Sequence, residues 1–135
     1  MRVALDANVL LRLIVEDDTA QHQIALDEVR AADRVIIPTV ALCETVWVLS
    51  RHYRFSRAEI ALALERLLDV DKTDYDDEAV DAGLIMLKAG GDFADAVIAL
   101  EGVRVGGDLL LTFDRKAVRH LSAMGAPVRL AGAAT

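Results

Sequence analysis

Two carboxylates in this sequence directly follow apolar runs of the kind that form buried strands. Asp6 comes after Val3–Leu5, and Asp114 comes after Leu-Leu-Leu-Thr-Phe. In open α/β sheets, ligands bind outside the carboxyl ends of parallel strands, so we expect both acids at one edge of a sheet. Each acid also precedes an expected helix, and N-capping is therefore the alternative role for both. At the first helix Asn8 is the better-placed cap, which leaves Asp6 available for chemistry.

Glu44 lies in an almost wholly apolar segment that we expect to be helical. Its neighbours one helical turn away are Val40, Ala41, Trp47 and Val48, and no Lys or Arg occupies a partner position. An ionised carboxylate on such a face costs several kcal/mol unless it is paired, or else its pKa rises. The alternative is an exposed helix edge that happens to be apolar. We expect instead that Glu44 lies in an apolar wall and helps to hold a cation.

A further pair of acids, Asp92 and Asp95, marks the start of another expected helix. Their i,i+3 spacing puts them on one face, where like charges destabilise a helix by roughly a few tenths of a kcal/mol. Asp95 precedes the apolar segment Ala96–Leu100, so we expect it at the inward-facing start of the helix. Asp92 has a sufficient structural explanation, because an acid in the first turn pairs favourably with the helix dipole.

These acids favour a metal site built only from oxygen ligands. Carboxylates from four segments, without His or Cys, suit hard cations such as Mg²⁺ or Mn²⁺. Two such ions about 4 Å apart recur in phosphodiester hydrolysis, where they activate a water and stabilise the leaving oxygen. The spacing of His22, His52 and His120 does not match a zinc site, and Cys43 fits core packing better than nucleophilic catalysis. The sequence has no P-loop, G-x-G-x-x-G or G-x-S-x-G motif, so other common enzyme classes lack support.

The segments between these acids alternate between short apolar strands and amphipathic helices, which predicts βαβ units and a parallel sheet covered on both faces. The expected strands are Val3–Leu5, Val35–Ile37, Leu68–Val70, Leu109–Thr112 and, at an edge, Val128–Leu130. The expected helices are Leu10–Ile14, Thr19–Ala32 with Thr19 as cap, Thr39–His52, one capped by Ser56 with Glu59 in the capping-box position, Asp76–Lys88, Phe93–Val103 and Asp114–Ser122. We expect a single three-layer α/β domain over residues 1–131 and a frayed tail at 132–135.

Composition limits the classes of partner. The chain has 135 residues, of which 54% are hydrophobic, and no apolar run is long enough to span a membrane, so we expect a cytoplasmic protein. The net charge of −7 by itself argues against a nucleic-acid partner. The argument weakens if several of the acids form a metal site, because bound cations reverse the local charge. Six aromatic residues argue against base stacking as the main mode of binding.

Two basic clusters and a surplus of apolar residues suggest surfaces for partners. The clusters, either phosphate contacts or ordinary solvated turns, are Arg51, His52, Arg54 and Arg57 after the Glu44 helix, and Arg115, Lys116 and Arg119 after Asp114. The mean hydropathy of +0.32 suggests more apolar surface than one small domain buries. We therefore expect a homodimer built largely from helices of the N-terminal half, and a groove for a partner segment.

Four segments together resemble the PIN domain family. They are Asp6-Ala-Asn8-Val-Leu-Leu, Pro38-Thr39 leading to Glu44, Asp92-Phe-Ala-Asp95-Ala-Val-Ile-Ala, and Thr112-Phe-Asp114-Arg115. Their order and spacing are similar, from end to end, to the toxin ribonucleases of VapBC-type toxin–antitoxin pairs. The resemblance implies a PIN-like α/β/α fold with a short parallel sheet in the order 3-2-1-4-5. It also implies a Mg²⁺- or Mn²⁺-dependent endoribonuclease that forms a homodimer and binds a small cognate antitoxin.

The resemblance also implies roles for individual residues. The positions that match the acidic quartet, which is both catalytic and metal-binding, are Asp6, Glu44, Asp95 and Asp114. Asn8 and Thr112 match the polar residues that usually support this quartet, and Asp92 matches an extra acid found in part of the family. No acid of the quartet is missing, so nothing in the motif indicates an inactive enzyme.

The main alternative is a PIN-like binding subunit with weak or lost nuclease activity, whose role is partner association or DNA-bound autoregulation. Two other classes fit less well. A haloacid-dehalogenase-type phosphatase requires D-x-D at the first strand, where this chain has Asp6-Ala-Asn8. A response-regulator receiver requires a mid-chain acceptor Asp and a late Lys, whereas the strand after Gly107 ends in Thr-Phe-Asp.

Overall fold

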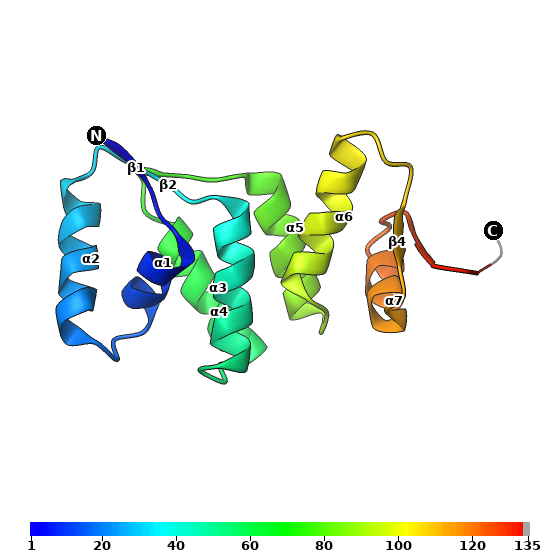
Figure 1. Cartoon of the computed structure of the whole chain (residues 1–135), viewed down its shortest axis with the longest axis horizontal. Coiled ribbons are helices and arrows are strands. Elements are labelled where there is room, and N and C mark those ends of the chain that lie inside the picture. Colours follow the sequence, from blue (N-terminus) through cyan, green and yellow to red (C-terminus); the bar gives the residue numbers. More distant parts are fainter. Residues whose placement is uncertain (134–135) are drawn as a thin grey trace. The chain divides into compact units, whose positions relative to one another are not determined.

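The computed structural model describes residues 1–133, in which helices and short parallel strands alternate (Figure 1). Contacts divide the chain into two compact units, Met1–Asp76 and Asp77–Thr135, which we call the N-terminal unit and the C-terminal unit. Residues 134–135, half of the tail expected at 132–135, lie outside the described residues. That residues 1–131 act as a single domain stays a prediction.

The N-terminal unit contains a three-stranded parallel sheet. Its strands are β1 (Arg2–Ala4), β2 (Arg34–Ile36) and β3 (Thr73–Asp74), in the order β1-β2-β3. The register pairs Val3 with Val35, and Val35 with Thr73. The helices of this unit are α1 (Ala7–Ile14), α2 (Thr19–Ala31), α3 (Thr39–Arg51) and α4 (Arg57–Leu68). Helix α1 packs against both α2 and α3, and α3 packs against α4.

The predicted strand Leu68–Val70 is wrong, because Leu68 is the last residue of α4 and the third strand is Thr73–Asp74. The predicted capping box at the start of α4 is confirmed, with Ser56 and Glu59 bonded reciprocally. From this start, helical spacing buries one side of α4 as far as Leu68, and an apolar run at the end of a helix is easily mistaken for a strand.

The predicted cap of α2 is also wrong. Asp18 rather than Thr19 is the N-cap, because its side chain accepts a hydrogen bond from the backbone N–H of Gln21 at 3.0 Å. Asp is a stronger N-cap than Thr, and it stands one residue earlier in the chain. The helix therefore begins with Thr19 inside its first turn.

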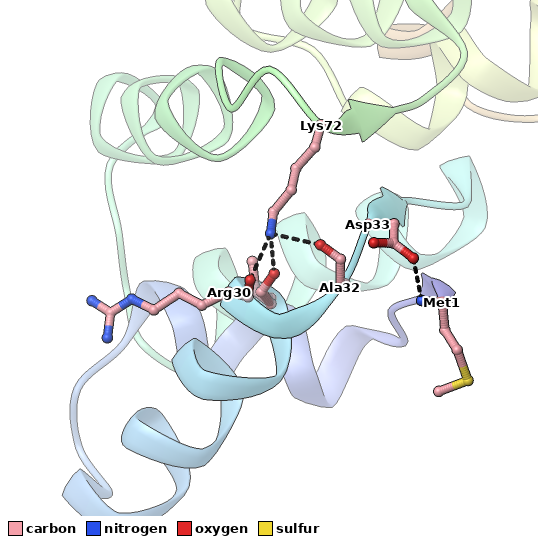
Figure 2. Close-up of polar contacts among 6 residues, drawn as sticks. Met1, Arg30, Ala32, Asp33 and Lys72 are labelled. Carbon is pink, nitrogen blue, oxygen red and sulfur yellow. Dashed lines mark hydrogen bonds and ion pairs between the residues drawn. The ribbon is translucent and has the colours of Figure 1, made fainter.

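Polar contacts tie the sheet of the N-terminal unit to its surroundings (Figure 2). The Lys72 ammonium, just before β3, donates to the backbone carbonyls of Val29, Arg30 and Ala32, which close the C-terminal end of α2. Lys72 thus satisfies carbonyls that a helix end leaves without partners. The N-terminal ammonium of Met1, just before β1, pairs with the carboxylate of Asp33, just before β2.

Strands β2 and β3 are joined by a two-pronged ion pair as well as by their backbones. The guanidinium of Arg34 contacts both carboxylate oxygens of Asp74, at 2.9 Å and 2.5 Å. This pairing holds the pKa of the Asp74 carboxyl below its usual value. A bidentate geometry of this kind fixes direction as well as distance.

The C-terminal unit contains a two-stranded parallel sheet and three helices. Strand β4 (Leu110–Thr112) pairs with β5 (Val128–Leu130), with Leu110 opposite Val128 and Thr112 opposite Leu130. The helices are α5 (Asp77–Lys88), α6 (Phe93–Arg104) and α7 (Arg115–Ala123). Helices α6 and α7 both pack against β4. The ends of α6 and α7 agree with the predicted helices to within one residue.

Helices α5 and α6 pack closely because glycine faces phenylalanine between them. Phe93 is fully buried, and a Cβ built on Gly83 would lie only 2.5 Å from its Cε2 atom. No larger residue than glycine fits at position 83 without displacing the ring. Behind this contact, Met86 of α5, Ala96 of α6 and Leu121 of α7 form a small apolar core.

Within each unit, the strand order agrees with the predicted order 3-2-1-4-5, because β3-β2-β1 and β4-β5 are neighbours in it. The pairing of the first strand with the fourth stays a prediction. Among residues 1–133, no helix combines the length and the apolar character needed to cross a membrane.

Candidate nuclease site

Asp6 lies where a parallel strand gives way to a helix. It follows β1 by two residues and is the N-cap of α1, with its Oδ1 accepting from the backbone N–H of Val9 at 3.0 Å. The prediction that Asn8 caps this helix is therefore wrong, since Asn8 lies inside the first turn. Both residues are exposed, and the bond to Val9 uses Oδ1 of Asp6 rather than its second carboxylate oxygen, Oδ2.

Glu44 occupies the middle of α3, but its surroundings differ from the prediction. The residue is exposed, and so are its same-side neighbours Val40 (78%) and Trp47 (63%). The predicted apolar wall around Glu44 is therefore wrong: these apolar side chains line an exposed edge of the helix. The buried polar residue of α3 is instead Thr45, whose hydroxyl donates to the carbonyl of Ala41 at 2.7 Å.

The C-terminal unit brings three of the predicted acids into electrostatic contact. Asp95 lies half-buried in the first turn of α6, while Asp92 and Asp114 are exposed at the starts of α6 and α7. Burial, together with the negative charges of Asp92 and Asp114, raises the pKa of Asp95 to about 6. The predicted inward-facing position of Asp95 is confirmed, and the three acids repel one another in the absence of a cation.

The junction between β4 and α7 is held by short-range hydrogen bonds. The backbone N–H of Asp114 donates to Oγ1 of Thr112 at 3.0 Å. Oδ1 of Asp114 accepts from the backbone N–H groups of Lys116 and Ala117, at 2.8 Å and 3.3 Å. Asp114 is thus the N-cap of α7, as its alternative role predicts, and Thr112 orients the residue that carries the carboxylate.

Asp92 has a similar local role, because its Oδ1 accepts from the backbone N–H of Ala94 at 3.1 Å and makes it the N-cap of α6. Asp95 makes no such bond and caps no helix. Among the described residues of this unit, Asp95 is therefore the half-buried acid that helix capping does not explain.

The chemistry of these groups fits a hard divalent cation. Within residues 1–133, no group of three or more His, Cys, Asp or Glu side chains is arranged to hold a metal ion. The donor set of the C-terminal unit is nevertheless entirely carboxylate, which Mg²⁺ and Mn²⁺ prefer. A cation beside Asp95 would offset the repulsion from Asp92 and Asp114 that raises its pKa.

The sequence motifs around these acids have one family in common. Residues 3–122 match the family model of the PIN domain. The chain belongs to the PIN domain family. A comparison with curated proteins gives no match.

Membership of the PIN family gives the fold a functional class. The seven helices and short parallel sheets of the described residues form a PIN-like α/β/α fold. PIN domains are generally metal-dependent nucleases, so the chain has a nuclease-type fold and is of the hydrolase class. The matched range contains every predicted site residue, from Asp6 to Asp114.

Sequence reasoning passed over one feature of the site region. Phe113 stands between Thr112 and Asp114, and its side chain is 88% exposed. Its position between two predicted site residues could have marked Phe113 as part of the site. Its exposure could not be predicted, because the apolar run that contains it indicates burial.

Proposed function

We propose that this chain is a Mg²⁺- or Mn²⁺-dependent endoribonuclease of the cytoplasm, in which Asp6, Glu44, Asp95 and Asp114 hold the metal. The observation that carries this proposal is the half-buried position of Asp95 beside Asp92 and Asp114, in a chain matched to the PIN family. Burial and the two neighbouring negative charges together raise the pKa of Asp95 to about 6. Structural proteins seldom gather unpaired carboxylates around a half-buried one, whereas active sites do so regularly.

The protein side chains have distinct tasks in this reaction. Asp6, Glu44, Asp95 and Asp114 would hold the metal, which would supply water activation and charge stabilisation for phosphodiester hydrolysis. Asp6 and Asp114 each use Oδ1 for a helix cap, which fixes the carboxylate and leaves Oδ2 for the ligand. Thr112 orients Asp114, and Asn8 and Asp92 are polar groups that support the site. Asp95, above its pKa at neutral pH, contributes its charge.

Cleavage of total RNA by the full chain tests this function. Wild-type protein with Mg²⁺ or Mn²⁺ should cut RNA, and EDTA should stop the reaction. Asp95→Asn should lower the rate by about 100-fold or more, because it removes one of the charges that stabilise the transition state. Asp81→Asn, which changes an exposed acid on α5, is the matched control and should cleave as wild type does. Equal cleavage by wild type and Asp95→Asn would contradict the proposal.

We further propose that the protein is the toxin of a type II toxin–antitoxin pair, inhibited by a small cognate antitoxin. A groove in the N-terminal unit supports a partner of this kind. Its volume is about 570 Å³, and it is lined by apolar side chains that include Leu13 and Ile14 of α1, Leu26 of α2, and Leu62 of α4. Such a groove suits the apolar side of an antitoxin segment.

Brief induction in a bacterial host tests the toxin role. We expect wild-type protein to arrest growth and to leave new RNA ends, whose sequencing identifies the RNA that is cut. We expect a short reading frame to adjoin the gene, and its co-expression should relieve the arrest. Leu62→Glu, which places a charge in the groove, should weaken that relief while leaving RNA cleavage intact. Full relief with Leu62→Glu would contradict the groove as the antitoxin site.

We also propose a homodimer. Exposed apolar side chains on the helices of the N-terminal unit support it, among them Ile24 (61%) of α2 and Val40 (78%) of α3. Sedimentation at tens of micromolar should give the mass of two chains. A monomer at that concentration would contradict the dimer but leave the antitoxin proposal intact.

A further inference from the structure

Two of the six aromatic residues are exposed, and both are close in sequence to a predicted site acid. Trp47 (63% exposed) follows Glu44 by one turn of α3, and Phe113 (88% exposed) directly precedes Asp114. The four that are buried or half-buried are Tyr53, Phe55, Tyr75 and Phe93. Both exposed aromatic side chains therefore lie close in sequence to a proposed catalytic acid, whereas Phe93, between Asp92 and Asp95, is buried.

Phe113 is held outward by an ordered corner of the chain. The corner is closed on one side by the bond from the Asp114 N–H to Thr112 Oγ1, at 3.0 Å, and on the other by the capping bonds of Asp114 to the first turn of α7. A loop without such bonds could fold its phenyl ring back against the core. Here the ring is 88% exposed, so a flat apolar surface that covered it would remove its area from water, which is favourable.

The helix that follows Phe113 supplies positive charge. Arg115, Lys116 and Arg119 are all exposed on α7, and none forms an ion pair with a side chain in the part of the chain that the structure describes. The chain as a whole carries a net charge of −7, so three unpaired cations on one short helix form a local exception. A ring beside cations suits a polyanion that also has flat apolar faces.

We propose that Phe113 stacks on an unpaired base of the RNA strand at the nuclease site, while Arg115, Lys116 and Arg119 contact its phosphates. This inference rests on the proposed ribonuclease function and adds to it a residue that contacts the substrate, Phe113. Stacking on a side chain requires a base whose face is free, and the bases of a duplex lack one. Phe113 is then a substrate-binding residue that holds the strand next to the acid that follows it.

Fluorescence anisotropy with a short labelled RNA that cannot pair with itself tests this inference. The full-length protein is titrated in EDTA, so that the RNA is bound but not cut. Phe113→Ala should weaken binding by about 5- to 100-fold, as expected for the loss of one stacked base. Phe113→Trp should restore it. Val105→Ala is the matched control, because it shortens an apolar residue that is 89% exposed in the same unit but away from the acids.

An abasic oligomer of the same length and charge separates stacking from charge. Wild type should bind it about as weakly as Phe113→Ala binds RNA, and Phe113→Ala should bind the two oligomers equally. Arg115→Gln and Arg119→Gln should each lower the slope of log affinity against log salt by about 0.7, whereas Phe113→Ala should leave that slope unchanged.

Three outcomes overturn the inference. Equal RNA affinity of wild type and Phe113→Ala, in a protein that cleaves RNA with metal, removes Phe113 from the binding site and leaves the proposed function intact. A change in sedimentation with unchanged RNA affinity assigns Phe113 to a contact between copies of the chain. Preference of wild type for duplex over single-stranded RNA excludes stacking. Absence of metal-dependent cleavage by the wild type would contradict the proposed function itself.

Discussion

The two units of this chain handle charge differently. In the N-terminal unit, Lys72 donates to carbonyls at the C-terminal end of α2, and Arg34 forms an ion pair with Asp74. The predicted acids of this unit, Asp6 and Glu44, are exposed and belong to different helices. In the C-terminal unit, Asp95 is half-buried beside two further acids, and its pKa rises to about 6. Both units contain ion pairs, with Arg104 and Glu78 paired in the C-terminal unit at 3.1 Å, but only around Asp95 does burial bring like charges together at a cost to stability, as functional sites commonly do.

The largest expected effect comes from removing one acid in each unit. Asp6→Asn and Asp95→Asn should each lower metal-dependent RNA cleavage by about 100-fold or more, because both carboxylates are proposed to hold the same metal. Only Asp95→Asn should raise the thermal stability of the metal-free protein, since it removes a repelled charge. Cleavage assays and melting curves in EDTA give the two readouts.

This comparison fails if Asp6→Asn keeps full activity with an intact fold, because the N-terminal unit would then contribute no essential acid. Glu44→Gln extends the test. Because Glu44 is exposed, its replacement should lower cleavage but change stability by less than about 0.5 kcal/mol.

A core substitution in the C-terminal unit should have the next largest effect. Gly83→Ala places a methyl group within van der Waals overlap of the buried Phe93 ring, so we expect a loss of about 1–3 kcal/mol in the free energy of unfolding. Gly102→Ala in α6 is the matched control, because a Cβ there meets no atom within 4 Å. Urea denaturation measures both, and equal stabilities would show that α5 and α6 separate easily.

The next largest effect concerns how the stability of the metal-free protein depends on pH. The pKa of Asp95 is near its ordinary value of 3.8 in the unfolded chain and about 6 in the folded protein, so the folded state binds more protons between these values. The contribution of Asp95 therefore makes the metal-free protein less stable as pH rises through that window. Asp95→Asn should flatten this slope in melting curves recorded in EDTA. If Asp95→Asn had the same pH slope as wild type, Asp95 would not be the source of this pH dependence.

The smallest effect concerns the cap of α7. Asp114→Asn keeps an oxygen that can accept from Lys116 and Ala117, whereas Asp114→Ala removes it. We expect Asp114→Ala to be about 1 kcal/mol less stable than Asp114→Asn, although both lose the same charge. Denaturation in EDTA compares them, and equal stabilities would show that the cap contributes nothing.

Much of this fold follows from local sequence signals. The capping box of Ser56 and Glu59, and the alternation of short apolar runs with amphipathic segments, predict most elements to within one or two residues. The third strand was misplaced because the apolar run around Leu68 fits a strand or a helix end equally well. Such runs are decided by packing, which in this case buries Leu68 as part of α4.

The candidate site was less accessible to sequence reasoning. That Asp95 faces inward follows from the apolar segment after it, and the structure confirms this position. The exposure of Glu44 and its neighbours could not be predicted from the sequence. An apolar helix face indicates burial even where no other part of the chain packs against it. The exposure of Trp47 and Phe113 could not be predicted for the same reason, because an aromatic residue type alone indicates burial.

Three of the predicted site acids cap a helix with the same kind of bond, in which a backbone N–H donates to a carboxylate oxygen: Asp6, Asp92 and Asp114. Each of these acids is thus proposed both to cap a helix and to belong to the site. The capping role restricts which substitutions these positions tolerate in a descendant that is no longer selected for cleavage. Drift at these positions should favour Asn, Ser or Thr, which still cap a helix, over Ala or Val. Asp95 and Glu44 cap nothing and should be replaced first. An inactive descendant would thus keep the outline of the site after losing its chemistry.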